Sequence, residues 1–433
     1  MRVLDPVELL QALIRFDTTN PPGNEAECLE YVRAQLDDVG CETELYAKEP
    51  GRPNLIARLR GSGSSPPLLL QGHVDVVTVR GQPWTRPPFS GELVDGYVWG
   101  RGALDMKGGV AMLVSAFARA ARERTALPGD VVLALLSDEE GGGDFGARFL
   151  VEEHAHLFQG VRYALGEFGG FSQEVGGRRF YPIQVAEKQI CWLKATIRGS
   201  GGHSAMINRG GTMARLGRFL RDLDRKRLPV HVTPVAREMI ERMAAPLARP
   251  QRAVMRALLE PALADRALPL LGERRRWFEP LLRNTVAATI VHAGEKINVV
   301  PAEIELQLDG RVLPGLGPDD LIDELRAAAG DDVELELVRY DPGPPEPDLA
   351  LFETLAAILR ELDPRAVPIP LLQIGATDAR FFARLGIQTY GFLPMRLPPD
   401  FTFLTYVHAA DERIPGDAVE FGAEAIFRAL QRF

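Results

Sequence analysis

Short apolar segments alternate with amphipathic segments through the first 185 residues of the chain. Apolar runs occur at 68–70, 131–136 and 163–165, and each is followed by a polar turn that contains glycine. Between the first two runs, residues 107–124 place apolar side chains on one side of a predicted helix. Continuous apolar strands that alternate with helices are typical of an α/β sheet covered on both faces. Further apolar runs near 371–372 and 390–392 extend this pattern toward the C-terminus.

The N-terminal segment predicts two helices before the first strand. Asp5 is followed by Pro6 and then by Glu8, which is a typical sequence for the start of a helix. The stretch 19–24 contains Pro and Gly and interrupts the chain. A second amphipathic helix is predicted after it, at about 25–39.

A different order of elements begins near residue 186. The predicted elements are a strand at 190–198, a helix at 212–224, strands at 285–291 and 302–312, a helix at 318–329 and a strand at 333–338. This β-α-β-β-α-β order is that of a ferredoxin-like domain. An Arg-rich and Leu-rich stretch at about 227–284 predicts an additional helical insertion. A Pro-rich segment, 341–347, follows the last strand and predicts a stiff connection.

These two patterns predict a smaller domain inserted into a larger one. We expect residues 186–343 to form the inserted domain. Residues 1–185 and 344–433 are expected to form the catalytic domain. In α/β sheets, functional sites gather at the carboxyl ends of the strands, so the residues that follow the apolar runs are the candidates for chemistry.

Composition and charge exclude several classes of protein. Lys and Arg total 50 against 59 Asp and Glu, and the net charge of −9 argues against a nucleic-acid-binding protein. The three cysteines form no C-x-x-C pair, which argues against a disulfide framework and a cysteine zinc site. Neither a membrane-spanning apolar run nor a signal-peptide pattern is present, so we expect a cytoplasmic protein that does not enter the membrane.

Five glycine-bordered or strand-end segments carry side chains that can bind hard metal ions. The candidate ligands are His73, Asp105, Glu139, Glu140, Glu167 and His408. Taken singly, each has an ordinary alternative role, such as a loop histidine, a helix cap or a surface acid. Their occurrence at successive strand ends favours a common site instead. Two histidines and three or four carboxylates suit one or two divalent ions such as Zn, Co or Mn.

The adjacent pair Glu139 and Glu140 can divide two tasks of a metallohydrolase. Neighbouring side chains on a turn point in different directions, so Glu140 can bind metal while Glu139 acts as a general base on water. Asp75 lies two residues after His73 on extended backbone and therefore on the same face. It is expected to accept the second N–H of the imidazole and fix its tautomer.

Three motifs resemble the co-catalytic zinc aminoacylase and carboxypeptidase family of metallopeptidases. They are QGHVDVV at 71–77, WGRGALDMKGG at 99–109 and DEEGG at 138–142. That family includes glutamate carboxypeptidase, aminoacylase-1, acetylornithine deacetylase and succinyl-diaminopimelate desuccinylase. The resemblance implies a zinc-exopeptidase-like α/β/α catalytic domain with an inserted ferredoxin-like domain that acts as a lid and in dimerisation.

The same resemblance implies a role for each candidate ligand. His73 and Glu167 would bind one zinc ion, Glu140 and His408 the other, and Asp105 would bridge the two. It also implies a cis peptide bond after Asp105.

Further implied residues lie outside the metal cluster. His203, in the glycine-rich turn 199–205, would stabilise the oxyanion, usually in the active site of a partner subunit. Asn298 matches a substrate-binding position, and Arg380 matches one that binds the substrate carboxylate. From its sequence context alone, Arg380 could equally form a surface ion pair. The helical insertion leaves the trans role of His203 and the dimer interface open.

The resulting hypothesis is hydrolysis of an amide or peptide bond next to a free carboxylate. The substrate would be an N-acyl amino acid or the C-terminal residue of a short peptide, and the cofactors would be two divalent ions, zinc above cobalt or manganese. A homodimer through the inserted domain is expected, with neither nucleic acid nor membrane as partner. Two alternatives stay open: an exopeptidase of the dipeptidase or aminopeptidase type, and an inactive homologue that only binds ligands.

Overall fold

The computed structural model describes residues 5–206, 208–330 and 332–433. The chain folds into two compact units. Unit 1 consists of residues 1–185, 347–371 and 377–433, and unit 2 of residues 186–346 and 372–376. The glycine-rich turn 199–205, which carries His203, lies within the described residues. In the described part of the chain, no helix is long and apolar enough to cross a membrane.

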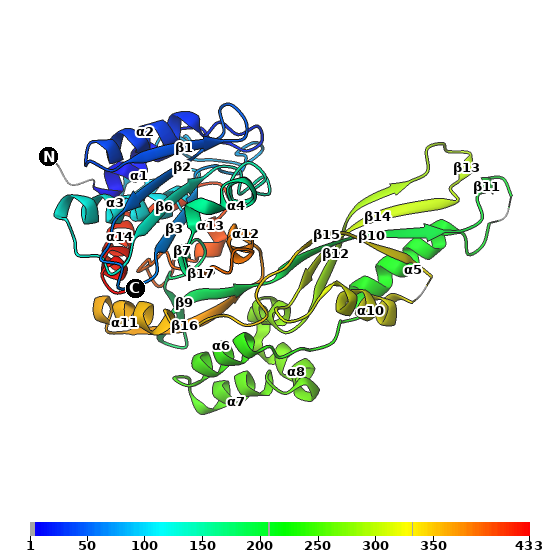
Figure 1. Ribbon diagram of the computed structural model, residues 1–433. Helices are drawn as coiled ribbons and strands as arrows, with labels where there is room; N and C mark the ends of the chain where they lie inside the picture. The colour runs from blue at the N-terminus through cyan, green and yellow to red at the C-terminus, as the bar shows by residue number, and fades with distance from the viewer. Residues whose placement is uncertain (1–4, 207, 331) are drawn as a thin grey trace. The chain divides into compact units, whose positions relative to one another are not determined.

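Unit 1 is built around a mixed sheet of nine strands (Figure 1), in the order β1-β2-β6-β3-β7-β17-β9-β16, with β8 beside β9. The strands are β1 (Thr43–Ala47), β2 (Pro53–Leu59), β3 (Leu68–His73), β6 (Val131–Leu136), β7 (Tyr163–Gly166), β8 (Gln173–Val175), β9 (Arg178–Glu187), β16 (Ala366–Gln373) and β17 (Gln388–Gly391). The central strands β6, β3, β7 and β17 are parallel. β1 pairs antiparallel with β2, β2 with β6, and β9 with β17. A smaller sheet joins β4 (Glu92–Val94), β5 (Tyr97–Trp99) and β18 (Arg413–Pro415).

Helices cover both faces of the large sheet. The helices are α1 (Pro6–Ile14), α2 (Ala26–Asp37), α3 (Lys107–Glu123), α4 (Ala147–Glu153), α11 (Phe352–Leu362), α12 (Ala379–Ala383), α13 (Phe403–Tyr406) and α14 (Gly416–Leu430), with a short 3-10 helix at Ala155–Phe158. Apolar side chains of α4 and α12 pack with those of β3 and β6 on one face. α3 contacts β3 and β6 and also packs against α1 and α14. The α/β/α architecture expected from the sequence is therefore present.

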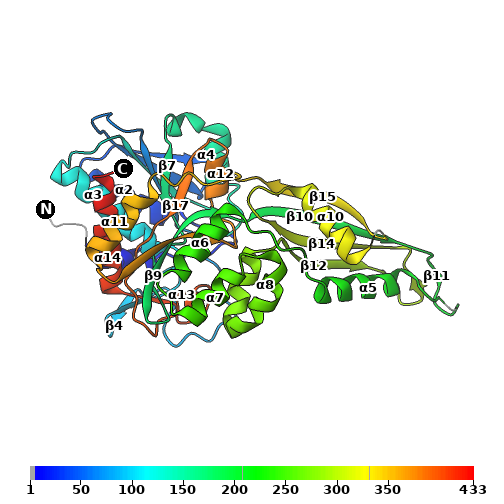
Figure 2. The same ribbon diagram turned by 90° about the horizontal axis from the view of Figure 1, so that it is seen from below.

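Unit 2 contains a four-stranded antiparallel sheet in the order β12-β14-β10-β15 (Figure 2). These strands are β12 (Thr285–Ala293), β14 (Glu303–Val312), β10 (Gln189–Arg198) and β15 (Glu334–Asp341). α5 (Thr212–Arg225) and α10 (Pro318–Ala329) supply apolar side chains to the core on one face of this sheet. The chain order β10-α5-β12-β14-α10-β15 is the β-α-β-β-α-β order that the sequence predicts.

Two additional features complete unit 2. Between α5 and β12 lie the helices α6 (Pro234–Ala244), α7 (Arg249–Ala257), α8 (Pro261–Ala267) and α9 (Arg275–Phe278), together with 3-10 turns at Leu268–Arg274 and Glu279–Leu281. They occupy the segment predicted as a helical insertion. The short strands β11 (Gly202–His203) and β13 (Val299–Val300) pair antiparallel, and they bring two predicted site residues onto neighbouring backbone.

Candidate metal centre

The carboxyl ends of three parallel strands place most of the predicted ligands at one edge of the unit 1 sheet. His73 is the last residue of β3 and pairs in register with Leu136, the last residue of β6. Glu139 and Glu140 follow β6 directly on a turn. Glu167 follows Gly166, the last residue of β7. This is the edge at which parallel α/β sheets bind ligands.

Two further ligand candidates come from turns rather than strand ends. Asp105 lies just before α3, and the peptide bond between Asp105 and Met106 is cis, as the resemblance implied. His408 lies between α13 and β18 and has a φ of 59°. Positive φ is uncommon for a residue with a side chain, so the surrounding structure must hold His408 in this conformation.

Asp105 lies between the two histidines. Its Oδ1 is 3.1 Å from His73 Nε2, and its Oδ2 is 3.2 Å from His408 Nε2. His73 Nε2 is also 3.4 Å from a carboxylate oxygen of Glu167, and His408 Nε2 is 3.0 Å from one of Glu140. Two triads of possible ligands therefore share Asp105, and within each triad the ligand atoms lie within 4.8 Å of one another.

Glu139 borders this cluster. Its Oε2 is 4.0 Å from His73 Nε2, farther than the Asp105 and Glu167 oxygens. Its side chain is 13% exposed, so the carboxylate keeps some access to solvent. A carboxylate in this position can reach a water molecule at the cluster without belonging to either of the two triads that share Asp105.

Asp75 is fully buried and connects the β3 end with the turn after β6. Its carboxylate accepts hydrogen bonds from the backbone N–H groups of Glu139 and Glu140, each at 3.1 Å. His73 Nδ1 is 3.4 Å from Asp75 Oδ1 and 3.0 Å from the Asp75 carbonyl oxygen. Both acceptors would favour the tautomer that leaves Nε2 free to bind metal. Asp75 thus contacts the backbone that carries the two glutamates as well as the imidazole.

Crowded carboxylates change the protonation of the cluster. Burial and the nearby charge of Glu167 raise the pKa of Glu139 well above its usual value. Burial and the charge of Asp105 raise the pKa of Glu140 to about 7. Bound cations would relieve this repulsion and keep the carboxylates ionised.

The histidines respond in the opposite direction. Hydrogen bonds to Asp105 and Glu140 raise the pKa of His408 to about 10. For His73, burial opposes the charged form, but the hydrogen bonds to Asp105, Asp75 and Glu167 outweigh it and raise the pKa. Two imidazoles set among carboxylates form a donor set that divalent ions such as zinc prefer. The residues present therefore fit a pair of divalent ions.

Two residues near the cluster were not identified from the sequence. Asn20 Nδ2 donates to Asp75 Oδ2 and to Asp138 Oδ1, each at 2.9 Å. Asp378 is 1% exposed, and among the described residues neither of its carboxylate oxygens has a hydrogen-bond partner. Burial raises the pKa of Asp378 to about 7. Its position in Thr377-Asp378-Ala379, directly before α12, was the available sequence signal.

Arg380 is 6% exposed, so the alternative of a surface ion pair is wrong. Its Nη1 donates to the Thr377 carbonyl oxygen at 2.7 Å and its Nη2 to the Gly142 carbonyl oxygen at 2.9 Å. The guanidinium therefore contacts the glycine turn that follows Glu140.

His203 and Asn298 belong to unit 2 and lie close to each other there. β11 and β13 pair His203 with Val299, and the Ser204 N–H donates to the Asn298 carbonyl oxygen at 3.2 Å. The His203 side chain is exposed, and its Nδ1 accepts the Ala205 N–H at 3.1 Å. This bond leaves Nε2 available as a donor.

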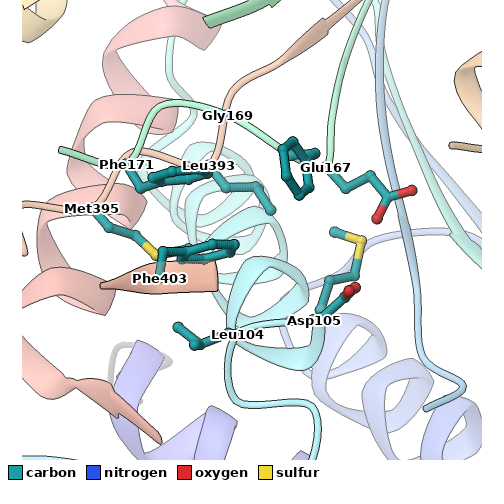
Figure 3. A pocket seen from close by; sticks show the side chains of 10 residues that line it. Leu104, Asp105, Glu167, Gly169, Phe171, Leu393, Met395 and Phe403 are labelled. Atoms are coloured by element: carbon teal, nitrogen blue, oxygen red, sulfur yellow. The ribbon is translucent and has the colours of Figure 1, made fainter. Parts of the chain in front are cut away.

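An apolar pocket borders Asp105 and Glu167 (Figure 3). The rings of Phe171 and Phe403 stack on the side away from these carboxylates, with centroids 4.1 Å apart and planes 5° from parallel. The remaining lining residues are Leu104, Met106, Phe168, Gly169, Leu393 and Met395. The cavity is about 10 Å³, which is room for one water-sized group.

Comparison with known sequences places the chain in a family. The sequence model of peptidase family M20/M25/M40 matches residues 69–432. The protein "Probable carboxypeptidase S-like 2" of Dictyostelium discoideum is 29% identical over 364 residues, covering 80% of this chain and 68% of its own length. The N-fatty-acyl-amino acid synthase/hydrolase of Homo sapiens is 28% identical, covering 85% and 75%. The succinyl-diaminopimelate desuccinylase of Paracoccus denitrificans is 28% identical, covering 99% and 98%.

Solved structures share the fold. An M20 family metallo-carboxypeptidase from Sulfolobus solfataricus has a TM-score of 0.69 at 17% identity, covering 99% of this chain and 98% of its own. A dinuclear metal binding peptidase of the M20 family from Bacillus subtilis has a TM-score of 0.60 at 14% identity, covering 98% and 96%. Because the family match extends over most of the sequence, the chain belongs to peptidase family M20/M25/M40 and is a hydrolase.

Proposed function

We propose that this protein hydrolyses an amide or peptide bond next to a free carboxylate, with two divalent ions, zinc in the first place, as cofactors. The observation that carries the proposal is the position of Asp105, whose two oxygens face His73 and His408 at 3.1 and 3.2 Å. A carboxylate shared in this way is what a two-metal hydrolase needs between its ions. Glu139 lies beside this arrangement as an additional carboxylate.

In this proposal His73 and Glu167 would hold one ion, Glu140 and His408 would hold the other, and Asp105 would contribute to both positions. When bound, the two ions would lower the pKa of water and polarise the amide carbonyl. Glu139 accepts the proton of the water whose oxygen forms the new bond to the carbonyl carbon. It then gives that proton to the amide nitrogen as the C–N bond breaks, so the products are a carboxylic acid and an amine.

Asp75 and the residues outside the cluster have supporting roles in the proposal. Asp75 keeps the His73 ring oriented and fixes the backbone of Glu139. His203 Nε2–H would stabilise the carbonyl oxygen as it gains negative charge, in cis or in trans. Asn298 and Arg380 are the proposed contacts for the substrate and its carboxylate.

The relatives support a substrate of this class. Their names describe a carboxypeptidase, an N-fatty-acyl-amino acid hydrolase and a desuccinylase. The pocket next to Asp105 and Glu167 is apolar, which suits an uncharged acyl group or side chain. Its volume of about 10 Å³ admits only one water-sized group, so in this conformation it would take no more than the terminal methyl of an acyl group or side chain.

A substrate panel with Zn²⁺ or Co²⁺ supplied is the direct test. We expect turnover of N-acetyl amino acids or of peptides with a free C-terminal carboxylate, and loss of turnover when that carboxylate is amidated. Turnover of amino-acid amides with a free α-amine would instead establish an aminopeptidase. Turnover of dipeptides only, with a requirement for the free amine, would establish a dipeptidase. Binding without turnover of any substrate would indicate a homologue that only binds ligands.

Glu139→Gln tests the general base. We expect kcat to fall about 10²- to 10⁴-fold with little change in KM, since the amide cannot accept the proton. The exposed Glu153→Gln is the matched control and should keep full activity. Full activity of Glu139→Gln would contradict the proposed mechanism.

We also propose that the protein forms a homodimer through unit 2 and acts in the cytoplasm. β12 is an edge strand of the four-stranded sheet, and Ile290 and Val291 on it are 49% and 45% exposed. Exposed edge strands with apolar side chains favour pairing with another chain. Light scattering of the wild type and of Ile290→Lys measures this, and a monomeric wild type would exclude it. Cell fractionation tests the compartment.

A further inference from the structure

Glu412 is a fully buried carboxylate whose oxygens are directed at the backbone of the Asp105 turn. It precedes β18 and has no exposed surface. Its Oε1 accepts the N–H groups of Leu104 at 2.7 Å and Asp105 at 3.2 Å. Its Oε2 accepts the Gly102 N–H at 3.2 Å and Arg101 Nη1 at 2.6 Å. With each oxygen accepting two donors, Glu412 is a poor candidate for a further metal ligand.

Arg101 extends this contact to the segment that carries His408. Its Nη2 donates to Gln82 Oε1 at 2.6 Å, and Gln82 Nε2 donates to the His408 carbonyl oxygen at 2.8 Å. Arg101 is fully buried and its guanidinium lies 5.2 Å from the centroid of the Trp84 ring. A continuous series of hydrogen bonds therefore runs from the Asp105 N–H through Glu412, Arg101 and Gln82 to the backbone of His408.

The two ends of this series belong to the same triad of possible ligands. Asp105 and His408, together with Glu140, form the second of the two groups that share Asp105. His408 has a φ of 59°, a conformation that persists only where neighbouring groups enforce it. The bond from Gln82 is one such contact. The Asp105 carboxylate must also keep both oxygens correctly directed, and its own N–H is held by Glu412.

A purely stabilising role does not account for this arrangement well. A buried ion pair loses the hydration of both charges, and apolar side chains of similar volume often stabilise a fold as much or more. The distinctive property of the Glu412 contacts is that they fix the direction of several backbone N–H groups and of one guanidinium. Residues outside the ligand shell that orient metal ligands in this way commonly change metal affinity 10- to 100-fold when they are altered.

We propose that Glu412, Arg101 and Gln82 are positioning residues for the metal position formed by Asp105, Glu140 and His408. They act through the backbone of Asp105 and His408 and make no contact with substrate. Their loss weakens binding most at this position, because only this triad contains His408, whose backbone Gln82 holds. The other triad shares Asp105 but draws His73 and Glu167 from the ends of β3 and β7. This inference rests on the proposed two-metal function.

The test is titration of the metal-free full-length protein with Co²⁺ or Zn²⁺, followed by calorimetry and by metal analysis after dialysis. We expect two ions per wild-type chain. In Arg101→Lys and in the milder Gln82→Leu, we expect one of the two sites to keep its wild-type affinity and the other to lose at least about tenfold. Activity should fall through kcat at low metal and return in excess Co²⁺ with KM unchanged.

Asp363→Asn is the matched control in unit 1. Asp363 is a buried carboxylate that accepts Arg179 Nη1 at 2.8 Å and the Tyr181 hydroxyl at 2.9 Å, and it contacts no proposed ligand. It should lose stability while binding two ions with wild-type affinities. Gln82→Leu remains informative if Arg101→Lys or Glu412→Gln does not fold.

Each outcome has a distinct meaning. A wild type that binds fewer than two ions contradicts the proposed two-metal function itself. A wild type that binds two ions, with unchanged affinities in folded Arg101→Lys and Gln82→Leu, overturns the inference alone. Equal weakening of both sites, with activity that excess metal does not restore, would also overturn it, since it indicates general destabilisation.

Discussion

Asn20→Ala removes the amide that joins two buried carboxylates. Asn20 Nδ2 donates one hydrogen bond to Asp75 and one to Asp138, each at 2.9 Å. Hydrogen bonds to charged groups contribute about 1.5–3 kcal/mol each, so two are worth about 3–6 kcal/mol. Asp138 keeps Arg52 and Phe145 as partners, and Asp75 keeps the two glutamate N–H groups. We therefore expect a loss of unfolding free energy near the lower end, about 3 kcal/mol.

Activity should fall as well, because Asp75 contacts the backbone of both glutamates. A displacement of Glu139 by about 1 Å can reduce kcat by about 100-fold. Urea denaturation followed by circular dichroism measures the stability, and steady-state kinetics at saturating metal measures kcat. Asn284→Ala is the matched control, since Asn284 is buried in unit 2 and donates to Glu324 at 3.0 Å. The control should lose stability without a comparable loss of kcat.

An ordinary surface substitution changes the free energy of unfolding by no more than about 0.5 kcal/mol. If Asn20→Ala stays within that range of the wild type and also keeps its kcat, the prediction is wrong. Loss of stability with unchanged kcat would show that Asp75 holds the glutamate turn without help from Asn20.

Four further predictions concern charge, the pocket and metal. Burial lowers the pKa of Lys188 from 10.5 to about 7, so between these pH values the unfolded chain binds more protons than the folded chain. The free energy of unfolding should therefore rise with pH, by at most about 1.4 kcal/mol per pH unit. Lys188→Met should flatten this rise in denaturant titrations at pH 7.5 and 9.5. Arg380→Lys should raise KM at least about tenfold in steady-state assays, because an ammonium cannot reproduce the fork of a guanidinium; an unchanged KM would refute this. Phe403→Ala should shift kcat/KM toward longer acyl chains, and an unchanged chain-length profile would exclude the pocket as the acyl site. Removal of metal by a chelator should abolish activity and lower Tm, since a ligand at 100 times its Kd stabilises by about 2.7 kcal/mol.

The strand-end residues could be predicted because their signals are local. The runs that became β3, β6 and β7 end at polar, glycine-containing turns, so His73 and Glu167 were assigned to one edge of a sheet from the sequence. The strands β1, β2 and β9 were not predicted. β2 begins with Pro53 and Asn54, and β9 begins with two arginines, so neither resembles a continuous apolar run. Their antiparallel pairing depends on long-range contacts that the local pattern does not encode.

The supporting residues could not be found in the same way. Asn20 lies in an Asn-Pro-Pro-Gly stretch that predicts a chain break, and nothing local indicates that its amide reaches Asp75 and Asp138. Glu412 lies beside a predicted ligand, but its partners are about 310 residues earlier in the chain. Such roles depend on tertiary distances, which a single sequence does not contain.

The pairing of β18 with β5 has a consequence for the synthesis of the protein. Arg413 pairs with Trp99 and Pro415 with Tyr97, so the segment after His408 is attached to backbone made early in translation. A nascent chain that ends before this segment already contains His73, Asp105, Glu140 and Glu167 but has no His408. The complete pair of triads therefore forms only after unit 2 and nearly all of the chain have left the ribosome. Proteolytic loss of the last 30 residues would remove the same histidine and leave a chain that lacks one of the proposed metal ligands.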